Sequence, residues 1–459
     1  MIIKNGLIIS EQSTYKADIL IKDEKIECIG NNIEEQGHEI IDAEGRYIIP
    51  GAIDVHTHMN LIAGNYPTVD DFYSGTIAAA CGGTTTIVDH LGFGPEGCNL
   101  SHQINKYHEL AHDKAMIDYS FHGVVQHLND EILDELEYHV NNGIISFKVY
   151  MAYNNKLSDD ELYRVLRKMK QLGGIVPVHA ENDQVINYFR AKYKSQGKIA
   201  PIYHAKSRPN NTESEAIGRI LNLAKLAGDA PVYIVHLSTK EGLQEVKEAR
   251  KRGQKNIFVE TCTQYLTLTE EKYEKDHFEG LKYIMAPPLR TKKDIDFLWK
   301  GINQGHIQTI GTDHCPFSFS QKLIAKNDFT IAPGGGPGVE ERVSVIFSEG
   351  VSKGKISINK FVEMMCTNPS RIYGLYPKKG VIQPGSDADI VIINPNSERE
   401  IKIKDLHGNS DYSMYEGLKV KCKIDRVILR GITIVKENEF LSNTIKGKFI
   451  KRKKINKNL

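Results

Sequence analysis

The sequence predicts an α/β fold, in which a (β/α)8 TIM barrel is combined with a small β-sandwich built by both ends of the chain. From residue 51 onward, short apolar segments alternate with helical stretches over about 260 residues, as eight strand–helix units require. Before and after this region the helical rhythm is absent and short β-branched segments recur. We therefore assign the sandwich to residues 1–50 and 377–445, the barrel to 51–376, and a basic tail to 446–459.

The N-terminal segment reads as a set of short strands. Its β-branched and partly alternating stretches are separated by Asn-Gly and Glu-Gly turns, which favour strand reversals. These stretches are MIIKNGLII, KADILIKDEKIECIG and EIIDAEGRYII. After residue 376, KKGVIQPGSDADIVIINP and KCKIDRVILRGITIVKENEF have the same character. One sandwich assembled from both termini, with the barrel inserted between them, is the simplest arrangement.

The middle of the chain contains eight candidate strands. They cover residues 52–56, 84–89, 115–121, 144–150, 174–179, 231–236, 256–262 and 307–313. Between them lie amphipathic stretches such as DDFYSGTIAAACGG, SDDELYRVLRKMKQLG and TESEAIGRILNLAKLAG. Such a repeat is also compatible with a doubly wound sheet. Polar residues at five of the eight strand ends favour the closed barrel, whose active sites lie at that end.

Those strand ends carry residues that bind metal ions. They are His56, His58, Lys148, His179, His236 and Asp313. Side chains two apart on a strand point the same way, so an H-x-H pair can hold one ion together. Imidazole and carboxylate suit zinc or manganese. Each histidine taken singly is more often a core residue; the pattern of positions is what indicates metal-assisted hydrolysis.

Lys148 admits two interpretations. A lysine within IISFKVY is ordinarily a paired core residue or one whose amine reaches solvent. Burial among cations instead lowers the pKa of an amine, and a neutral amine can add carbon dioxide to become a carbamate. The carbamate is an oxygen anion that can bridge two divalent ions.

Composition narrows the class of protein. The chain carries 59 basic and 58 acidic residues, so it lacks the basic surface expected of a nucleic-acid partner. Seven scattered cysteines without CxxC pairs argue against a disulfide framework and fit the cytoplasm. We find neither a signal peptide nor a membrane span. The one basic run, Lys446–Lys457, reads as a solvated tail, with a subunit contact as the alternative.

Taken together, the motifs resemble those of the cyclic amidohydrolases, in the hydantoinase/dihydropyrimidinase branch. The resemblance covers nearly the whole chain and rests on PGAIDVHTH, AAACGGTTTIVDH, GIISFKVYMAY, PVHAE, IVHLS, VETCTQYLTL, APPLR, IGTDHC and GVIQPGSDADIVI. The segments DHLGFGPEGC, IDYSFHGVVQH and HGNSDYSMYEG are most similar to the bacterial D-phenylhydantoinases.

This resemblance implies a binuclear metal centre. One ion would be held by His56, His58 and Asp313, the other by His179 and His236, with N6-carboxylated Lys148 as the bridge. Zinc is the expected metal, with manganese as the alternative. A hydroxide bridging both ions would open a 5-substituted hydantoin, such as D-phenylhydantoin, to an N-carbamoyl amino acid. The resemblance further implies a homotetramer.

The family pattern also assigns residues to catalysis and to the substrate. Asp313 would move the proton from the hydroxide to the leaving ring nitrogen, and the hydroxyl of Tyr153 would stabilise the oxyanion. Tyr153 and the backbone of two further positions would bind the ring. Those positions usually hold Ser and Asn, and here they are Ala286 and Gly334. Substituent preference is expected in the loops after the first, second and fourth strands, where Leu61, Ile62, Phe93 and Tyr153 could form an apolar wall.

Other members of the superfamily are alternatives. Dihydroorotases usually carry an arginine two residues after H-x-H, where this chain has Asn60. Allantoinases typically follow H-x-H with Glu-Pro-Gly, which is also missing here. A dihydropyrimidinase or an allantoinase acting on another cyclic ureide is the main alternative. A non-catalytic assembly protein is the remote one, because such relatives have lost metal ligands that this chain keeps.

Overall fold

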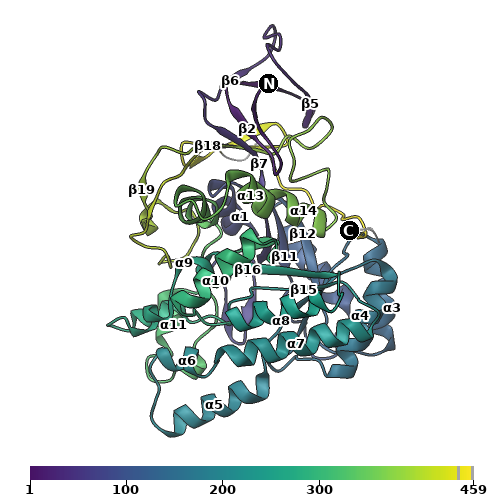
Figure 1. Ribbon diagram of the computed structural model, residues 1–459, viewed down its shortest axis with the longest axis vertical. Helices are drawn as coiled ribbons and strands as arrows, with labels where there is room; N and C mark the ends of the chain where they lie inside the picture. Colours follow the sequence, from purple (N-terminus) through teal and green to yellow (C-terminus); the bar gives the residue numbers. More distant parts are fainter. Residues whose placement is uncertain (442–444, 456–459) are drawn as a thin grey trace.

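A computed structural model describes residues 1–441 and 445–455. Its centre is a sheet of eight parallel strands whose order follows the chain (Figure 1). The strands are β8 (Ala52–Thr57), β11 (Thr84–His90), β12 (Asp118–Val124), β13 (Phe147–Tyr150), β14 (Val176–His179), β15 (Val232–Ile234), β16 (Ile257–Cys262) and β17 (Thr309–Gly311). The predicted barrel is confirmed.

The first and last strands of this sheet are joined through the residues around them. A parallel bridge links Thr57 to His314, just beyond β17. The buried guanidinium of Arg342 donates hydrogen bonds to the carbonyl of Ile53 in β8, at 3.0 Å, and to that of Ile310 in β17, at 2.9 Å. One cation thus satisfies carbonyls from both edges, which brings β8 and β17 together.

Helices follow the strands and cover the outside of the barrel (Figure 1). The longer ones are α1 (Phe72–Cys81), α2 (Leu100–Ala111), α3 (Asp130–Asn141), α4 (Asp159–Leu172), α5 (Asp183–Ser195), α7 (Asn210–Leu226), α8 (Lys240–Lys251) and α10 (Lys292–Asn303). Helix α4 illustrates how the sequence sets their limits. Ser158 and Glu161 form a capping box at its start, and Gly173 ends it in the left-handed conformation, with φ of 74°.

The two ends of the chain build β-sheets together. In a seven-stranded sheet, β7 (Tyr47–Pro50) pairs with β18 (Ile390–Asn394), which pairs in turn with β21 (Lys423–Leu429). This sheet also contains β2 (Leu7–Ile9), β3 (Thr14–Lys16), β22 (Ile432–Lys436) and β23 (Glu439–Phe440). A four-stranded sheet consists of β1 (Ile2–Lys4), β4 (Asp18–Lys22), β5 (Lys25–Gly30) and β6 (Ile40–Asp42).

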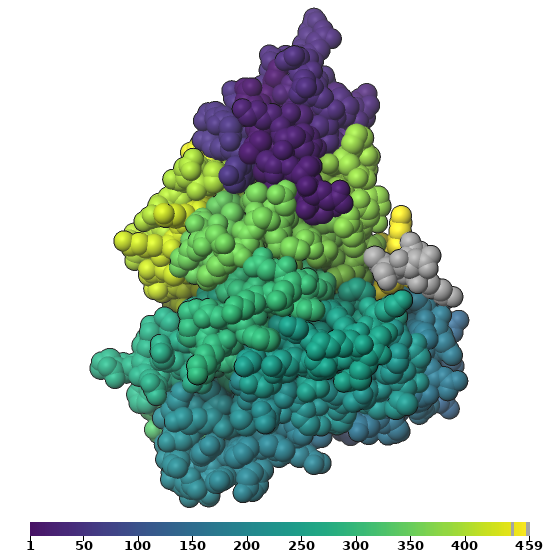
Figure 2. All heavy atoms as spheres, viewed as in Figure 1, coloured from purple at the N-terminus to yellow at the C-terminus, as the bar shows by residue number. Residues whose placement is uncertain are grey.

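A separate apolar cluster packs these sheets. It contains Ile3 and Ile48 from the N-terminal part and Ile390 and Ile428 from the C-terminal part, all fully buried. Figure 2 shows the N-terminal segments in purple next to C-terminal segments in green and yellow, with the barrel on the far side of the latter. The expectation that both termini form one strand-rich unit is confirmed.

Several predicted bounds differ from the structure in detail, and most observed barrel strands are shorter than expected. The third barrel strand was expected at 115–121 and lies at Asp118–Val124. The carbonyl of Ala115 instead accepts the N–H of Gly447 in the C-terminal segment. In the described part of the predicted basic tail, residues 446–455, the five lysines are exposed as expected, but Ile450 and Arg452 are buried. This segment crosses the N-terminal ends of the barrel strands, where Arg452 N–H donates to the carbonyl of Gly143 at 3.0 Å. The Arg452 side chain is buried and donates to the carbonyl of Phe121. Residues 456–459 of the predicted tail lie outside the described residues.

None of the helices among residues 1–441 and 445–455 combines the length and the apolar character needed to cross a bilayer.

Candidate metal centre and active site

A cavity of about 490 Å³ opens at the C-terminal ends of the barrel strands. All the site residues predicted from the sequence line it. They are His56, His58, Lys148, Tyr153, His179, His236, Ala286, Asp313 and Gly334. The apolar residues Leu61, Ile62 and Phe93, from the loops after the first two strands, line it as well. The cavity thus brings together residues as far apart in the chain as His56 and Gly334, which are separated by 278 positions.

One group of candidate ligands comprises His56, His58 and Asp313. Oδ1 of Asp313 lies 3.1 Å from Nε2 of His56 and 3.2 Å from Nε2 of His58. Ligand atoms bound tetrahedrally to zinc at about 2.0–2.1 Å lie roughly 3.3 Å from one another. The observed separations match that spacing, so these atoms fit a common divalent ion.

The second group faces the first across the barrel mouth. Nδ1 of His179 lies 2.9 Å from Nε2 of His236, and the rings of His236 and His56 stack with centroids 5.5 Å apart. Lys148 lies within β13 and is 2% exposed. Its side chain lines the cavity, and the ring of Tyr150 lies 5.4 Å from its Nζ. This donor set fits a second ion beside the first.

Burial decides the charge of most of these groups. It lowers the pKa of His58, His179 and His236, which favours the neutral imidazoles that bind metals. Burial also lowers the pKa of Lys148, to about 8, despite the attraction of Asp313 and Glu260. Carbamate formation requires the neutral amine, and the lowered pKa increases its fraction.

Asp313 and His56 are exceptions, because each has partners of opposite charge. Burial alone would raise the pKa of Asp313, but His56 and His58 outweigh it and hold the pKa well below its ordinary value. Burial likewise opposes protonation of His56, while the carboxylates of Glu260 and Asp313 raise its pKa to about 9. Asp313 is therefore ionised, as a metal ligand and a proton acceptor must be.

Two buried glutamates orient the histidines, and neither was predicted. Oε1 of Glu260 lies 2.6 Å from Nδ1 of His56 and accepts the His236 backbone N–H at 3.0 Å. Oε2 of Glu181 lies 2.9 Å from Nε2 of His179 and accepts from Arg208. Such carboxylate–histidine pairs fix the ring orientation of metal ligands.

The sequence contains a pattern from which these two glutamates could have been predicted as partners of buried groups. Glu181 follows His179 by two residues in PVHAE, and Glu260 lies within the apolar run of β16. A carboxylate inside an apolar run requires a partner, because burial of an unpaired charge is costly.

Tyr153 lies at the rim of the cavity with 36% of its surface exposed. Its ring lies 4.9 Å from that of His179, and its backbone N–H donates to Asp183 at 3.1 Å. Enclosure by the cavity walls raises the pKa of its phenol, so the hydroxyl stays protonated. The residue has a left-handed backbone with φ of 73°, an uncommon conformation that clusters at functional sites. Tyr153 can therefore donate a hydrogen bond into the cavity.

Ala286 and Gly334 offer backbone groups to the cavity. Within the described chain, neither peptide group of Ala286 nor the N–H of Gly334 enters a backbone hydrogen bond. Gly334 does not have the left-handed conformation, and a Cβ built on it would meet open space. The loop therefore allows larger residues at this position, and its glycine widens the cavity.

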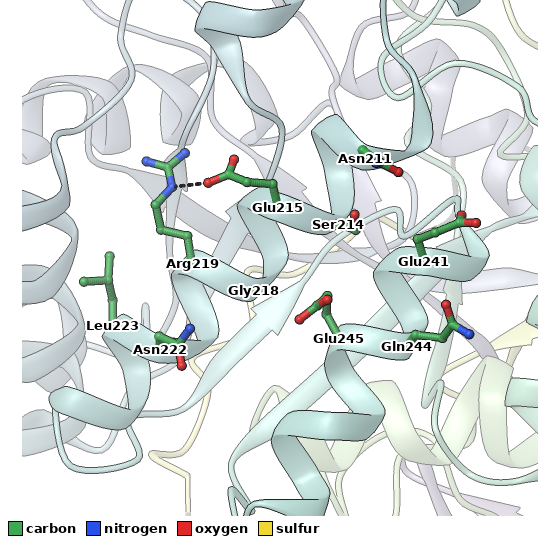
Figure 3. A pocket seen from close by; sticks show the side chains of 10 residues that line it. All are labelled: Asn211, Ser214, Glu215, Gly218, Arg219, Asn222, Leu223, Glu241, Gln244 and Glu245. Atoms are coloured by element: carbon green, nitrogen blue, oxygen red, sulfur yellow. Dashed lines mark hydrogen bonds and ion pairs between the residues drawn. The ribbon is translucent and has the colours of Figure 1, made fainter.

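A second hollow, of about 690 Å³, lies between α7 and α8 on the outside of the barrel (Figure 3). Polar and acidic side chains line it, including Glu215, Glu241 and Glu245. Glu215 pairs there with Arg219 at 3.1 Å. The hollow contains none of the predicted site residues, so its larger volume does not make it the active site.

Comparisons with known proteins agree with the geometry. A model of the amidohydrolase family matches residues 47–434. D-phenylhydantoinase of Escherichia coli O7:K1 is 48% identical over 455 residues, which cover 99% of this chain and 98% of the relative. The crystal structure of dihydropyrimidinase from Brevibacillus agri NCHU1002 has a TM-score of 0.97 at 44% identity, covering 99% of both chains. L-hydantoinase (dihydropyrimidinase) from Arthrobacter aurescens has a TM-score of 0.90 at 29% identity, covering 98% of this chain and 99% of that one. The chain belongs to the amidohydrolase family, in its hydantoinase/dihydropyrimidinase branch.

Proposed function

We propose that this enzyme hydrolyses a cyclic amide, a 5-substituted hydantoin of the D-phenylhydantoin type, to an N-carbamoyl amino acid. The observation that carries the proposal is the convergence of two histidine groups, Lys148 and Asp313 in one cavity at the barrel mouth. Relatives of nearly the same length that are 48% identical bear the name D-phenylhydantoinase, which supports the substrate class.

We further propose two divalent ions, zinc in preference to manganese. His56, His58 and Asp313 would hold one ion and His179 and His236 the other, with Lys148 as a bridging carbamate. Bound ions of this kind supply Lewis-acid activation of water and of the amide carbonyl. The lowered pKa values of His58, His179 and His236 and of the Lys148 amine support this assignment.

The protein's own groups would move the proton and hold the ring. Attack of water on the amide carbonyl forms a C–O bond, and breaking the C–N bond leaves a ring nitrogen that needs a proton. Asp313, ionised and at the cavity wall, would accept the proton of the water and pass it to that nitrogen. Tyr153 would donate a hydrogen bond to the developing oxyanion. The free backbone groups at Ala286 and Gly334 would pair with the imide.

The substituent would lie against the loops after the first two strands. Leu61, Ile62 and Phe93 line the cavity there, and the ring of Phe93 lies 5.0 Å from that of Tyr150. Burial of an aromatic substituent against apolar side chains is favourable in proportion to the area covered. This wall supports a phenyl substituent over the unsubstituted ring of dihydrouracil.

The assembly and the compartment are also proposals. The family resemblance supports a homotetramer, which light scattering of the purified enzyme would measure directly. All seven cysteines are free, and Cys81, Cys262, Cys315, Cys366 and Cys422 are buried. Unpaired thiols support a reducing compartment, for which the cytoplasm is the proposal.

Replacement of Tyr153 by phenylalanine is expected to lower kcat by about 100-fold and to leave KM nearly unchanged, because an oxyanion donor acts mainly in the transition state. Steady-state ring opening of 5-phenylhydantoin measures both constants. Tyr188→Phe, on the exposed face of α5, is the control. Equal activity of Tyr153→Phe and the wild type would reassign the residue to packing.

Replacement of Gly334 by asparagine is expected to leave KM within about twofold, because the main chain makes the proposed contact. The free energy of unfolding should rise by about 0.4–1 kcal/mol, since the unfolded chain loses backbone freedom. Gly335→Ala is the contrasting variant. Its Cβ would lie 2.4 Å from the carbonyl oxygen of Cys315 and φ is 144°, so it should destabilise the enzyme. A tenfold fall in KM for Gly334→Asn would instead show that the side chain binds the ring.

The proposed substrate is tested by measuring how fast one metal-loaded preparation of the enzyme opens several cyclic compounds. The rings are the two 5-phenylhydantoin enantiomers, dihydrouracil, allantoin and dihydroorotate, and each reaction is followed by its ring-opened product. We expect the D-phenyl compound to be opened with the highest kcat/KM. Preference for dihydrouracil or allantoin would keep the chemistry and reassign the substrate, whereas failure to open any ring would contradict the proposed function.

A further inference from the structure

Lys322 is a fully buried lysine that the proposed mechanism does not use. It lies in the short helix α11 (Phe319–Leu323) and has no exposed surface. Its Nζ donates hydrogen bonds to three backbone carbonyls, of Ile284 at 2.8 Å, Pro333 at 2.6 Å and Gly335 at 2.6 Å. Its hydrogen bonds go only to main-chain oxygens, so its role lies in the segments it holds.

Those three carbonyls belong to the two backbone segments at the cavity wall. Ile284 precedes Ala286 by two residues, and Pro333 and Gly335 flank Gly334 on either side. The segments also meet directly, because the N–H of Gly335 donates to the carbonyl of Ile284 at 3.0 Å. Lys322 therefore joins the two segments from the side away from the cavity.

The neighbours of Ala286 are tied in the same way. Nε2 of His204 lies 2.7 Å from the carbonyl of Met285, and the hydroxyl of Tyr265 donates to the carbonyl of Pro287 at 2.6 Å. The peptide groups of Ala286 itself stay free of backbone hydrogen bonds within the described chain. A fixed frame with free donors and acceptors at its inner edge is the arrangement that a planar imide requires.

The chemistry of lysine suits this position. An ammonium has three N–H groups, which match three carbonyl acceptors, whereas the planar fork of arginine does not fit three oxygens around one point. Burial lowers the pKa of Lys322 to about 7, and the three acceptors favour the charged form. The ring of Phe317 lies 5.5 Å from Nζ.

We propose that Lys322 is a positioning residue for the substrate: it holds the segments around Ala286 and Gly334 at the spacing that lets their backbone groups bind the ring. The proposal rests on the proposed function, since it assumes that these two segments contact a cyclic amide. It adds a specificity-determining residue outside the cavity wall, because Lys322 does not line the cavity and acts only through the main chain.

The test compares Lys322→Met and Lys322→Arg with Lys326→Met, which changes an exposed lysine four residues away. Metal content, kcat and KM are measured for the ring that the wild type opens best. For Lys322→Met, KM should rise at least about tenfold and kcat fall less than about threefold, with wild-type metal content. Lys322→Arg should also raise KM, and Lys326→Met should change neither constant.

Hydrogen exchange gives a second result that does not depend on turnover. The amide of Gly335 should exchange slowly in the wild type and at least about tenfold faster in Lys322→Met, while amides in β14 stay unchanged. If Lys322→Met does not fold, Lys322→Gln, which keeps two N–H groups, takes its place. If neither variant folds, the wild type still provides a test. Fast exchange of its Gly335 amide would contradict the proposal that Lys322 holds the two segments together.

Two outcomes contradict the positioning role in a folded variant. One is a wild-type KM with unchanged exchange at Gly335. The other is a parallel loss of metal and kcat, which would indicate a general structural role. Failure of the wild type to open any ring contradicts the proposed function instead, and the exchange experiment then still decides whether Lys322 holds the two segments.

Discussion

Replacement of Lys148 by alanine is expected to abolish metal retention and ring opening together. The variant removes the proposed bridge between the two ions and leaves two separate ligand groups, of which the second consists of two histidines whose pKa values are lowered by burial. Loss of a bridging anion weakens both sites, because each ion loses a ligand and its charge compensation. Metal analysis of the purified variant should find far fewer than two ions per chain, and kcat should fall by at least about 1000-fold.

Short carboxylic acids provide the control for this prediction. Acetate or propionate can occupy the space left by the truncated side chain and supply the two missing oxygens, so partial activity should return in their presence. Lys168→Ala, which removes a surface lysine paired with Glu137 at 2.9 Å, should behave as the wild type. If Lys148→Ala retains the metal content of the wild type, the proposed bridging carbamate is wrong.

Replacement of Asp313 by asparagine is expected to lower kcat by about 100- to 10,000-fold while the fold is retained. The amide has nearly the same shape, but it cannot accept a proton and binds divalent ions weakly. Its contacts with His56 and His58, at 3.1 and 3.2 Å, are local to the cavity, so the barrel should not depend on them. Stopped assays of the N-carbamoyl product measure the loss, and circular dichroism checks the fold.

The matched variant is Asp328→Asn, which alters a carboxylate paired with Lys194 at 2.6 Å away from the proposed ligands. It should keep wild-type turnover. Substantial kcat in Asp313→Asn with both ions bound would exclude Asp313 as the group that moves the proton. If Asp313→Asn loses both turnover and one of the two ions, Asp313 would be assigned to metal binding alone.

The barrel and the residues at the C-terminal ends of its strands could be predicted from the sequence, because a local sequence pattern marks each of them. An apolar run that ends in a histidine, as in PVYIVHLS, places that side chain at the end of a strand, and parallel strand ends meet in space. His179 and His236 are 57 residues apart in the chain and 2.9 Å apart between ring nitrogens. Their roles as ligands remain predictions until metal is measured.

Contacts between distant segments could not be predicted in this way. Glu260 accepts from His56, 204 positions away, and nothing around VETC states which histidine it meets. Lys322 has three carbonyl partners, and backbone acceptors leave no trace in the sequence. The polar residues next to Lys322 in the sequence predict an exposed helix surface, although the residue is fully buried.

The C-terminal segment is the clearest difference. KGKFIKRKKINK has the composition of a solvated tail, yet Ile450 and Arg452 are each only 4% exposed. The backbone of this segment forms hydrogen bonds with Ala115, Tyr119, Gly143 and Gly173, at the N-terminal ends of the barrel strands. Burial of Arg452 depends on the carbonyl of Phe121 that the fold supplies, and composition does not contain that information.

Activity measured against metal equivalents tests the central claim most directly. The enzyme is stripped with a chelator, reloaded with zinc in steps, and assayed for opening of D-5-phenylhydantoin. The account predicts negligible activity in the stripped enzyme and a rise that saturates at two equivalents per chain. Full activity without metal, or saturation at one equivalent, would contradict a binuclear centre.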